Sequence, residues 1–369
     1  MKRLVLIGGG HAHVHVLAAL AKAPFAATEV VLVAPFSRQI YSGMLPGWIA
    51  GYYAIEECAL ALDTLARRAG IGIVQTACTG LDLDARQVRC ATGETIAFDY
   101  ASIDAGPVGN LDQIAGAAKH GLPIRPIEGF VAAWPALLER TRRQGAGFKL
   151  AIVGDGAAAV ELAFAIQARL TTEGLGAARL TLIGGNPEPL AGFPFLLRRK
   201  AARLLAERGI AHVGTQRVTT VRPGRVELAD GSSLDADAAL IATGAAAPAW
   251  PAASGLATDA NGFIRVDRSL QSLSHPFVFA AGDIAAYGDP RPKSGVFAVR
   301  AGPPLAANLR AVCQGQAPQP WQPQQRALYL LSTGQKHALV AWGGFSASGA
   351  WAWRWKDRID RGFVARCGS

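Results

Sequence analysis

The sequence predicts an α/β fold in which two doubly wound parallel sheets are joined, one inserted within the other. An apolar run at residues 4–7 ends in the glycine-rich turn 8–10 and opens onto an alanine-rich segment. The run at 150–153 ends in a second turn at 154–156 and does the same. A strand, a glycine turn and a helix form the repeating unit of such sheets. The order of elements after the first turn repeats after the second, so we predict two copies of one architecture.

The first copy is predicted from its apolar runs and turn residues. It begins with a strand, a crossover helix and a second strand, and then reaches a loop that glycine and proline keep irregular. A helix, a short strand, a small β-meander and a strand that returns to the sheet complete it. In this order, the predicted ranges are 4–7, 14–22, 30–34, 41–47, 60–69, 71–74, 80–98 and 99–106.

The second copy repeats this order. The chain enters it near residues 106–122 and leaves it near 245–250, and glycine and proline recur at these crossings. We therefore expect a discontinuous first domain of residues 1–108 and 246–320, with the second domain at 109–245. A C-terminal hairpin and amphipathic segment would occupy 321–369. The elements predicted for the second copy are strands 150–153, 180–183 and 238–244, helices 158–169 and 195–208, and a meander at 217–234.

The composition excludes several classes of protein. Half of the residues are apolar and 17% are charged, which is typical of packed cores rather than disorder. The net charge of +10 is spread along the chain, so nucleic-acid binding is not expected. The chain contains no stretch of about 18 uninterrupted apolar residues, so we predict no membrane-spanning helix. The five cysteines are scattered and form no C-x-x-C pair, which indicates a reducing compartment and no structural disulfides.

The glycine turns carry the main chemical signal. A turn of this kind lets the backbone approach a pyrophosphate, and the N–H groups of the following helix start point at its negative charge. Two such turns, followed by the segment 279–283 (FAAGD), predict Rossmann-like domains that bind two dinucleotides side by side. That arrangement is typical of flavoproteins that pass electrons from a nicotinamide to a flavin.

The first turn departs from the G-x-G-x-x-G pattern in two ways. His13 stands at the third glycine, and we expect it to tilt the following helix outward. Ala34 and Pro35 stand where an acidic residue would hold a ribose. His11 and His15 have the i, i+4 spacing of metal ligands, but they lie at a helix start that faces phosphates. We therefore predict that His11 packs on a cofactor, and we predict no metal site.

Two other places offer polar contacts to a flavin. Asp283 follows a predicted strand, where its carboxylate would accept hydrogen bonds from ribityl hydroxyls or, alternatively, cap the next helix. A helix that starts within residues 293–298 would direct N–H groups at the flavin C2 carbonyl and N1, where negative charge gathers on reduction.

The second turn matches the pattern at Gly154, Gly156 and Ala159, because alanine is accepted at the last position. Glu161 lies one turn into the helix, where it would either reach a nicotinamide amide or form a helix salt bridge. Residues 184–186 carry no acid that would select NADH. Arg198 and Arg199 lie further on, so the choice between NADH and NADPH is left open.

The C-terminal tail mixes aromatic and basic residues. Ile359 and Phe363 are spaced i, i+4 on one helical face, while basic residues occupy the others. Such a segment either docks on a bilayer surface or packs its aromatic residues on the first domain or a second subunit. Packing is favoured, because the amphipathic segment is short.

These motifs resemble the pyridine nucleotide-disulfide oxidoreductase superfamily without its redox disulfide. Within it, the chain resembles the branch that groups type II NADH dehydrogenases with sulfide:quinone oxidoreductases. The segments 8–14 (GGGHAHV), 41–47 (YSGMLPG) and 355–360 (WKDRID) resemble the bacterial flavoproteins found beside or fused to selenide, water dikinase. The cysteine pair of sulfide oxidation has no equivalent here, and the membrane-binding C-terminus of type II NADH dehydrogenases is shortened.

The resemblance implies FAD in the first domain and NAD(P)H in the second. Lys356 would be the catalytic side chain, an electrostatic partner of the reduced flavin or of the acceptor, near the loop 41–46. FAD would be held by Gly8, Gly10, His11, Ala12, Pro35, Met44, Pro46, Gly106, Gly282, Asp283, Gly295, Val296 and Phe297. The nicotinamide site would be lined by Gly154, Gly156, Glu161 and Gly244.

The function implied is hydride transfer from NAD(P)H to FAD N5, followed by delivery of electrons to a small-molecule acceptor, in the first instance a quinone. Two alternatives stay open: a small soluble sulfur or selenium substrate, and a flavin-binding sensor that turns over slowly. The expected location is the cytoplasm. Contact of the C-terminus with the inner face of the cell membrane and a homodimer are further open expectations.

Overall fold

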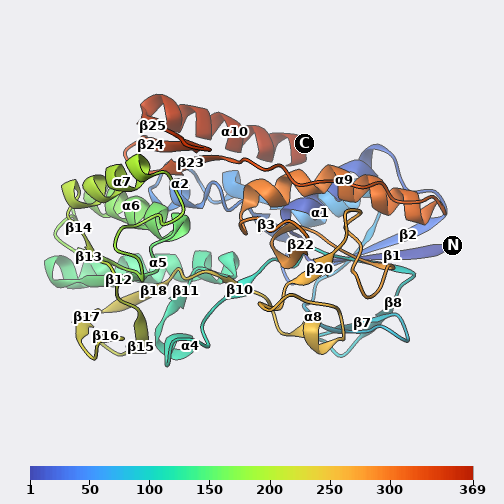
Figure 1. Ribbon diagram of the computed structural model, residues 1–369, viewed down its shortest axis with the longest axis horizontal. Coiled ribbons are helices and arrows are strands. Elements are labelled where there is room, and N and C mark those ends of the chain that lie inside the picture. Colours follow the sequence, from blue (N-terminus) through green and yellow to red (C-terminus); the bar gives the residue numbers. More distant parts are fainter. Residues whose placement is uncertain (369) are drawn as a thin grey trace.

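The computed structural model describes residues 1–368. It contains the two parallel sheets that the sequence predicts, each of five strands (Figure 1). The first sheet has the order β21-β9-β1-β2-β5, and every neighbouring pair in it is parallel. Its strands are apolar along most of their length because helices cover them. The bounds are β1 Lys2–Ile7, α1 His11–Lys22, β2 Thr28–Val33, α3 Leu62–Ala69, β5 Gly72–Val74, β9 Tyr100–Ile103, β21 Val278–Ala280 and α9 Gly295–Cys313.

The second sheet has the order β11-β18-β12-β13-β14 and is also parallel throughout. Its central strand β12 leads through the second glycine turn into α6, as β1 leads through the first turn into α1. The bounds are β11 Leu122–Pro123, α5 Ile127–Gln144, β12 Lys149–Val153, α6 Ala157–Thr172, β13 Arg179–Ile183, α7 Phe195–Glu207, β14 Ile210–Val213 and β18 Ala238–Ile241.

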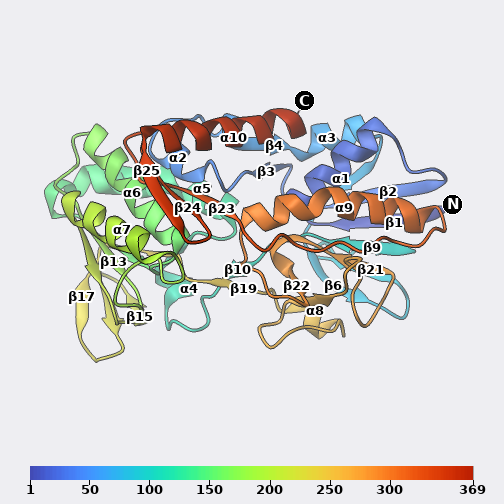
Figure 2. The same cartoon turned by 45° about the horizontal axis from the view of Figure 1, so that its top comes forward.

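The chain crosses between the two sheets at two adjacent places. β10 (Val108–Gly109) and β19 (Ala245–Ala246) pair in antiparallel fashion, so the outgoing and returning segments lie side by side (Figure 2). Each sheet carries a predicted three-stranded meander. The meander strands are β6 Cys78–Asp82, β7 Gln87–Cys90 and β8 Thr95–Ala97 in the first copy, and β15 Val218–Arg222, β16 Arg225–Leu228 and β17 Ser233–Asp235 in the second.

Local structure differs from the prediction at the loop 41–47. Residues from Leu45 onward form the short helix α2 (Leu45–Ile49), with Pro46 in its first turn, where the missing N–H is tolerated. Leu45 and Ile49 pack in the core of the second sheet. Shorter elements complete this part of the chain: β3 Arg38–Ile40, β4 Ala59–Ala61, α4 Ala117–His120, α8 Trp250–Ala253, β20 Ile264–Val266 and β22 Ala285–Tyr287.

The C-terminal region lies within the predicted range 321–369 but contains a strand that was not predicted. The hairpin is extended by a third strand, and the sheet β23-β24-β25 leads directly into the helix α10, which lies across the top of the molecule from the second sheet toward the first (Figure 2). The expectation of a short segment was wrong, because α10 has 19 residues. The bounds are β23 Leu328–Ser332, β24 Ala338–Trp342, β25 Phe345–Gly349 and α10 Ala350–Gly368.

Ile359 and Phe363 lie one turn apart on α10, as the i, i+4 spacing predicts, but they differ in burial. Phe363 is 4% exposed and packs in the first core, whereas Ile359 is 40% exposed. Trp351 and Trp355 are exposed as well, and their rings stack at 6.3 Å. The packing expected for the tail aromatics therefore holds for Phe363 and not for these two tryptophans.

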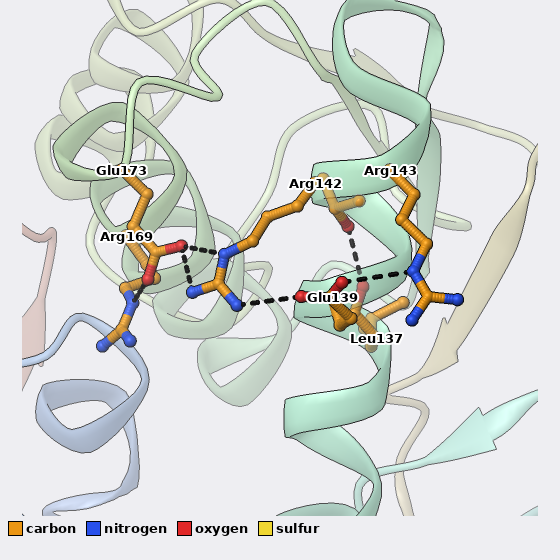
Figure 3. A network of polar contacts seen from close by, with 7 residues as sticks. Leu137, Glu139, Arg142, Arg143, Arg169 and Glu173 are labelled. Carbon is orange, nitrogen blue, oxygen red and sulfur yellow. Dashed lines mark hydrogen bonds and ion pairs between the residues drawn. The ribbon is translucent and has the colours of Figure 1, made fainter.

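A polar network on the surface joins α5 to α6 (Figure 3). Arg142 Nη2 lies 2.6 Å from Glu173 Oε2, and Arg169 binds the other oxygen of the same carboxylate. Glu139 pairs with Arg142 and Arg143 one turn along α5. Exposed pairs of this kind contribute at most about 1 kcal/mol each, so the apolar cores dominate the stability. Within residues 1–368, no helix has the length and apolar character needed to cross a bilayer.

Candidate functional site

A cavity of about 400 Å³ lies at the carboxyl ends of the strands of the first sheet. Ligands bind at this edge of open α/β sheets, because the loops there surround a crevice. The turn after β1 forms one wall, and Arg125, from the segment before α5, reaches in from the second sheet. Predicted FAD residues that line this cavity are Gly8, Gly10, His11, Pro35, Gly106, Asp283 and Gly295.

The glycines of the first turn are required by the protein itself. Gly8 has φ +91°, and a Cβ there would lie 2.5 Å from Ala105 Cα. A Cβ on Gly10 would lie 2.3 Å from Asp104 Cγ. The group that lies close to Gly10 is therefore the Asp104 carboxylate, a contact that we did not predict from the sequence. The signal was available, since Asp104 ends a predicted strand beside the first turn.

Asp104 caps α1. Its Oδ2 accepts hydrogen bonds from the backbone N–H groups of Ala12 at 2.7 Å and His13 at 3.0 Å. These groups would otherwise lack partners at the helix start. The side chain is buried, and burial raises the pKa of Asp104 to about 7 against the pull of these two hydrogen bonds, with the nearby Asp283 adding to the rise. The carboxyl group is therefore poised to change charge near neutral pH.

We expect Asp104→Asn to weaken the pH dependence of stability between about pH 4 and 7. The pKa of Asp104 is raised from 3.8 to about 7 in the folded chain, so the folded state holds its proton more tightly than the unfolded state. The wild type therefore loses stability as pH rises through this window, by up to about 4 kcal/mol. The asparagine keeps an acceptor for both N–H groups and has no proton to lose. Thermal unfolding at a series of pH values measures the difference.

Asp104→Ala is the matched comparison, because it leaves both N–H groups without an acceptor at every pH. The lowered pKa values of His11 and His13, both about 4, produce the opposite trend, a loss of stability as pH falls from 6.5. All three proteins share these histidines, so subtraction isolates Asp104. Parallel curves for the wild type and the asparagine variant would contradict the assignment.

His13 occupies the third glycine position by forming hydrogen bonds with the turn. Its Nδ1 lies 2.6 Å from the carbonyl oxygen of Gly8, and its Nε2 lies 2.8 Å from Ser102 Oγ. Because a carbonyl only accepts, Nδ1 donates to Gly8, and in the neutral ring Nε2 then accepts the Ser102 hydroxyl proton. Burial lowers the pKa of His13 to about 4, which agrees with this state. The histidine is thus a buried link between the turn and β9.

His11 and His15 face the aromatic side of α10. The His11 ring stacks on Phe363 at 5.9 Å and lies 5.3 Å from Tyr41. Burial, and then the charges of His15 and Arg125, lower the pKa of His11 to about 4. Within the described residues, the buried Nε2 of His11 has no hydrogen-bond partner. An unpaired buried polar atom in a cavity wall fits a polar ligand atom.

Asp283 and Arg125 face one another in the cavity, with Nη1 and Oδ2 3.5 Å apart. Asp283 lies in the short turn Gly282–Ile284 and not at the start of the next helix, which excludes the capping alternative. The start of α9 follows at Gly295, after Ser294. The cavity therefore combines a carboxylate, a guanidinium and a helix start, a set suited to hydroxyl groups, phosphate and a carbonyl oxygen.

The second turn has a different internal arrangement. Gly154 has φ +125°, and a Cβ there would lie 2.5 Å from Ala242 O. Gly156 has an ordinary φ of −77°, and a Cβ there would meet no atom within 4 Å. Asp155 accepts hydrogen bonds from the backbone and side chain of Asn186. Thr243 Oγ1, beside Gly244, is buried without a partner in the described part of the chain.

Arg198, one of the two arginines that left the choice between NADH and NADPH open, donates a hydrogen bond to Glu188 at 2.7 Å. Of the two arginines, therefore, Arg198 is already paired. Arg199 is exposed on α7. The choice between NADH and NADPH stays open.

Glu161 and Lys356 come together although they lie far apart in the sequence. Lys356 Nζ donates to the Gly43 carbonyl at 2.6 Å and to Asp360 Oδ2 at 2.7 Å. Burial lowers the pKa of Lys356, but Asp360 and Glu161 outweigh it and the net shift is upward. Burial raises the pKa of Glu161 to about 7, against the opposing charge of Lys356. Glu161 Oε1 also accepts the Ser332 N–H at 2.7 Å, so the predicted alternative of a helix salt bridge is not what the structure has.

Several predicted residues lie outside the lining of the cavity. Met44 is buried in a separate apolar cluster with Ile40, Tyr53 and Cys58. Gly282 lies against Asp104. Ala12 belongs to the capped start of α1. The others outside the lining are Pro46 in α2, Val296 and Phe297 in the first turn of α9, Lys356 in α10, and Gly154, Gly156, Glu161 and Gly244 in the part of the chain that forms the second sheet.

Comparison with known proteins identifies relatives of the chain. The profile of the family described as pyridine nucleotide-disulphide oxidoreductase matches residues 2–302. An NADH dehydrogenase-like protein of Mycobacterium tuberculosis is 27% identical over 63% of this chain and 60% of its own length. An alternative NAD(P)H-ubiquinone oxidoreductase of Arabidopsis thaliana is 25% identical over 78% of this chain and 62% of its own. The chain thus spans about 60% of the length of these relatives.

Solved structures share the fold. The sulfide:quinone oxidoreductase of Aquifex aeolicus superposes with a TM-score of 0.82 at 19% identity, over 100% of this chain and 92% of its own. A type II NADH dehydrogenase structure from Plasmodium falciparum gives 0.83 at 13% identity, over 98% and 97%. The family match covers most of the residues from which the two glycine turns and the cavity are built. The chain belongs to the pyridine nucleotide-disulphide oxidoreductase family, and its cofactors are FAD and NAD(P)H.

Proposed function

We propose that the chain is an oxidoreductase that takes a hydride from NAD(P)H onto FAD and passes the electrons to a quinone. The observation that carries this proposal is the meeting point of the two sheets. Ser42 lines the cavity of the first sheet, and the carbonyl of the next residue, Gly43, accepts a hydrogen bond from Lys356, whose charge lowers the pKa of Glu161 on α6. A pyridine ring held at the second turn and a flavin held at the first would approach one another there.

In this proposal, residues 1–108 and 246–320 hold FAD and residues 109–245 hold NAD(P)H. The flavin supplies the capacity to accept a hydride and release electrons. The residues of the chain position the groups. Asp283 and Arg125 would hold the chain that links the flavin to its phosphates, the N–H groups at the start of α9 would be available to the flavin carbonyl, and Glu161 and Lys356 would border the acceptor. Holding both rings in contact is the main contribution of the protein to such a transfer.

A quinone is the favoured acceptor because relatives of the chain carry that activity in their names. They include the Arabidopsis thaliana ubiquinone oxidoreductase and a demethylphylloquinone reductase of Synechocystis, which is 26% identical over 56% of this chain. A stripe of exposed residues on α10, Trp351, Trp355 and Ile359, would let the chain rest on a bilayer surface, with Arg354 and Arg358 toward the lipid headgroups. The finer resemblance to the flavoproteins associated with selenide, water dikinase stays a prediction, so selenium and sulfur compounds belong in the test.

The test begins with anaerobic mixing of the purified protein with NADH or NADPH. We expect rapid bleaching of the flavin absorbance, followed by reoxidation on addition of a short-chain quinone. A protein that holds no flavin, or a reduced protein that no quinone reoxidises, would overturn the proposal. Reoxidation by selenite or polysulfide instead would favour the soluble acceptor, and very slow bleaching would favour the sensor.

The same assay with a long-chain quinone in anionic vesicles tests the membrane contact. Trp351→Ser with Trp355→Ser should lower turnover on vesicles and leave turnover with the soluble quinone unchanged. Leu273→Ser is the matched control, because Leu273 is equally exposed, at 50%, and belongs to the first-sheet region. An equal loss with both quinones would contradict the contact.

A further inference from the structure

Cys78 and Cys90 face one another across the hairpin of β6 and β7. The antiparallel register pairs their positions, and a register shift follows between Cys78 and Gly80, on the side away from Ala77. The neighbouring pair, Ala77 and Ala91, is joined by a backbone hydrogen bond of 2.8 Å from Ala91 N to Ala77 O. Hydrogen-bonded and non-hydrogen-bonded pairs alternate along an antiparallel ladder. The two cysteines therefore form a non-hydrogen-bonded pair.

This register suits a disulfide. In a non-hydrogen-bonded pair, the Cα atoms lie about 4.5 Å apart and the side chains point to the same face of the sheet. Disulfides span Cα separations of about 4.4–6.8 Å. A bridge between Cys78 and Cys90 therefore requires little movement of the backbone. Both residues are free thiols in this structure.

The two thiols differ in access. Cys78 is partly exposed and lines the cavity of the first sheet. Cys90 is 4% exposed and packs in the core of that sheet. A small reagent therefore meets Cys78 first, while Cys90 is held close by as the second thiol.

We propose that Cys78 and Cys90 form a reversible dithiol–disulfide pair in the wall of the cavity, with a low-molecular-weight disulfide as the oxidant. The Cys78 thiolate attacks one sulfur of the reagent, the S–S bond of the reagent breaks, and one small thiol leaves. Cys90 then loses its proton to water and attacks the sulfur of Cys78, which releases the second small thiol. The protein pair loses two electrons, and the reagent gains them as it becomes two thiols.

The rate of this reaction depends on pH. Burial raises the pKa of Cys78 to about 12, against a hydrogen bond with the Gly80 backbone, and the nearby Cys90 raises it further. Burial, and then Glu94, also raise the pKa of Cys90. The thiolate is the nucleophile, so the exchange is slow at neutral pH and its rate rises by about tenfold per pH unit below the thiol pKa. The pair therefore responds to sustained rather than brief oxidation.

The sequence makes the test direct, because Arg86 and Arg89 lie between the two cysteines. Trypsin releases Cys78 in the peptide 69–86 and Cys90 in the peptide 90–119, each with a single cysteine. The folded protein, with FAD bound and after removal of FAD, is incubated with oxidised glutathione at several pH values, quenched with acid, alkylated and digested without reductant. We expect the two peptides to be found linked, with faster linking when the cavity that Cys78 lines is free of FAD. We also expect the link to form faster at higher pH and to be reversed by dithiothreitol.

Two variants make the result specific. Cys90→Ala should stop at the mixed disulfide of Cys78 with glutathione. Cys313→Ala, which removes a buried cysteine at the end of α9, should form the link as the wild type does. The proposal would be overturned if the folded protein forms no linked peptides at strongly oxidising glutathione ratios, or if the link forms only in denaturant.

Discussion

Gly156→Ala should raise the KM for NADH by on the order of tenfold or more, with flavin content and unfolding temperature unchanged, where each factor of ten is about 1.4 kcal/mol. Gly156 has an ordinary φ of −77° at the start of α6, and a methyl group there would meet no atom of the chain within 4 Å. The protein therefore has room for the side chain. In the proposed function, that room belongs to the pyrophosphate of NAD(P)H, which the added methyl would displace.

Gly154→Ala is the contrasting variant. Gly154 has φ +125°, and a Cβ would lie 2.5 Å from Ala242 O, so the change strains the fold itself. We expect it to lower the unfolding temperature. Stopped-flow reduction of the flavin by NADH, with thermal unfolding of both variants, separates the two effects. A Gly156→Ala protein with wild-type KM would show that the pyridine nucleotide does not approach this turn.

Lys356→Met should slow electron delivery to the acceptor strongly and shift its pH profile toward higher pH. Lys356 holds the Gly43 carbonyl and the Asp360 carboxylate, and its charge lowers the pKa of Glu161. Without that charge, the pKa of Glu161, already raised to about 7 by burial, rises further. A pH-dependent step that needs the Glu161 carboxylate therefore moves to a higher pH.

Removal of one partner of a buried ion pair costs about 3–5 kcal/mol, so Lys356→Met alone also lowers stability. Lys356→Arg keeps the charge and should keep the pH profile. Lys356→Met with Glu161→Gln should lose the profile altogether. Turnover with a short-chain quinone from pH 6 to 9 measures all three, with thermal unfolding as the control for folding. A loss of stability with an unshifted pH profile would reduce Lys356 to a structural contact.

The sequence predicted the elements whose signals are local. The turns 8–10 and 154–156 each follow an apolar strand and precede a helix, and both lead into the helices of the parallel sheets observed. The prediction of an irregular loop at 41–47 was only partly right, because Leu45 begins a helix whose apolar side chains pack on the second sheet. In the tail, the third strand β25 was not predicted, and the burial of Phe363 but not of Ile359 depends on packing against the first core.

The candidate site shows the same division. The ends of parallel strands share one edge of the sheet, and this predicts that the residues following them line one cavity. The structure has this arrangement for Gly8, Gly10, Asp283 and Gly295. The contacts of the His13 ring could not be predicted from the sequence, because its hydrogen bond to Ser102 depends on a strand much later in the chain.

The sequence by itself determined the two parallel sheets, their glycine turns and the insertion of one sheet within the other. Strand, turn and helix signals act over a few residues, so they can be recognised before any folding is known. Only the tertiary structure decided that Asp104 caps α1, that Lys356 faces Glu161 and that Cys78 lies opposite Cys90. These contacts depend on register and on the packing of segments that are far apart in the chain, and burial then sets their charges.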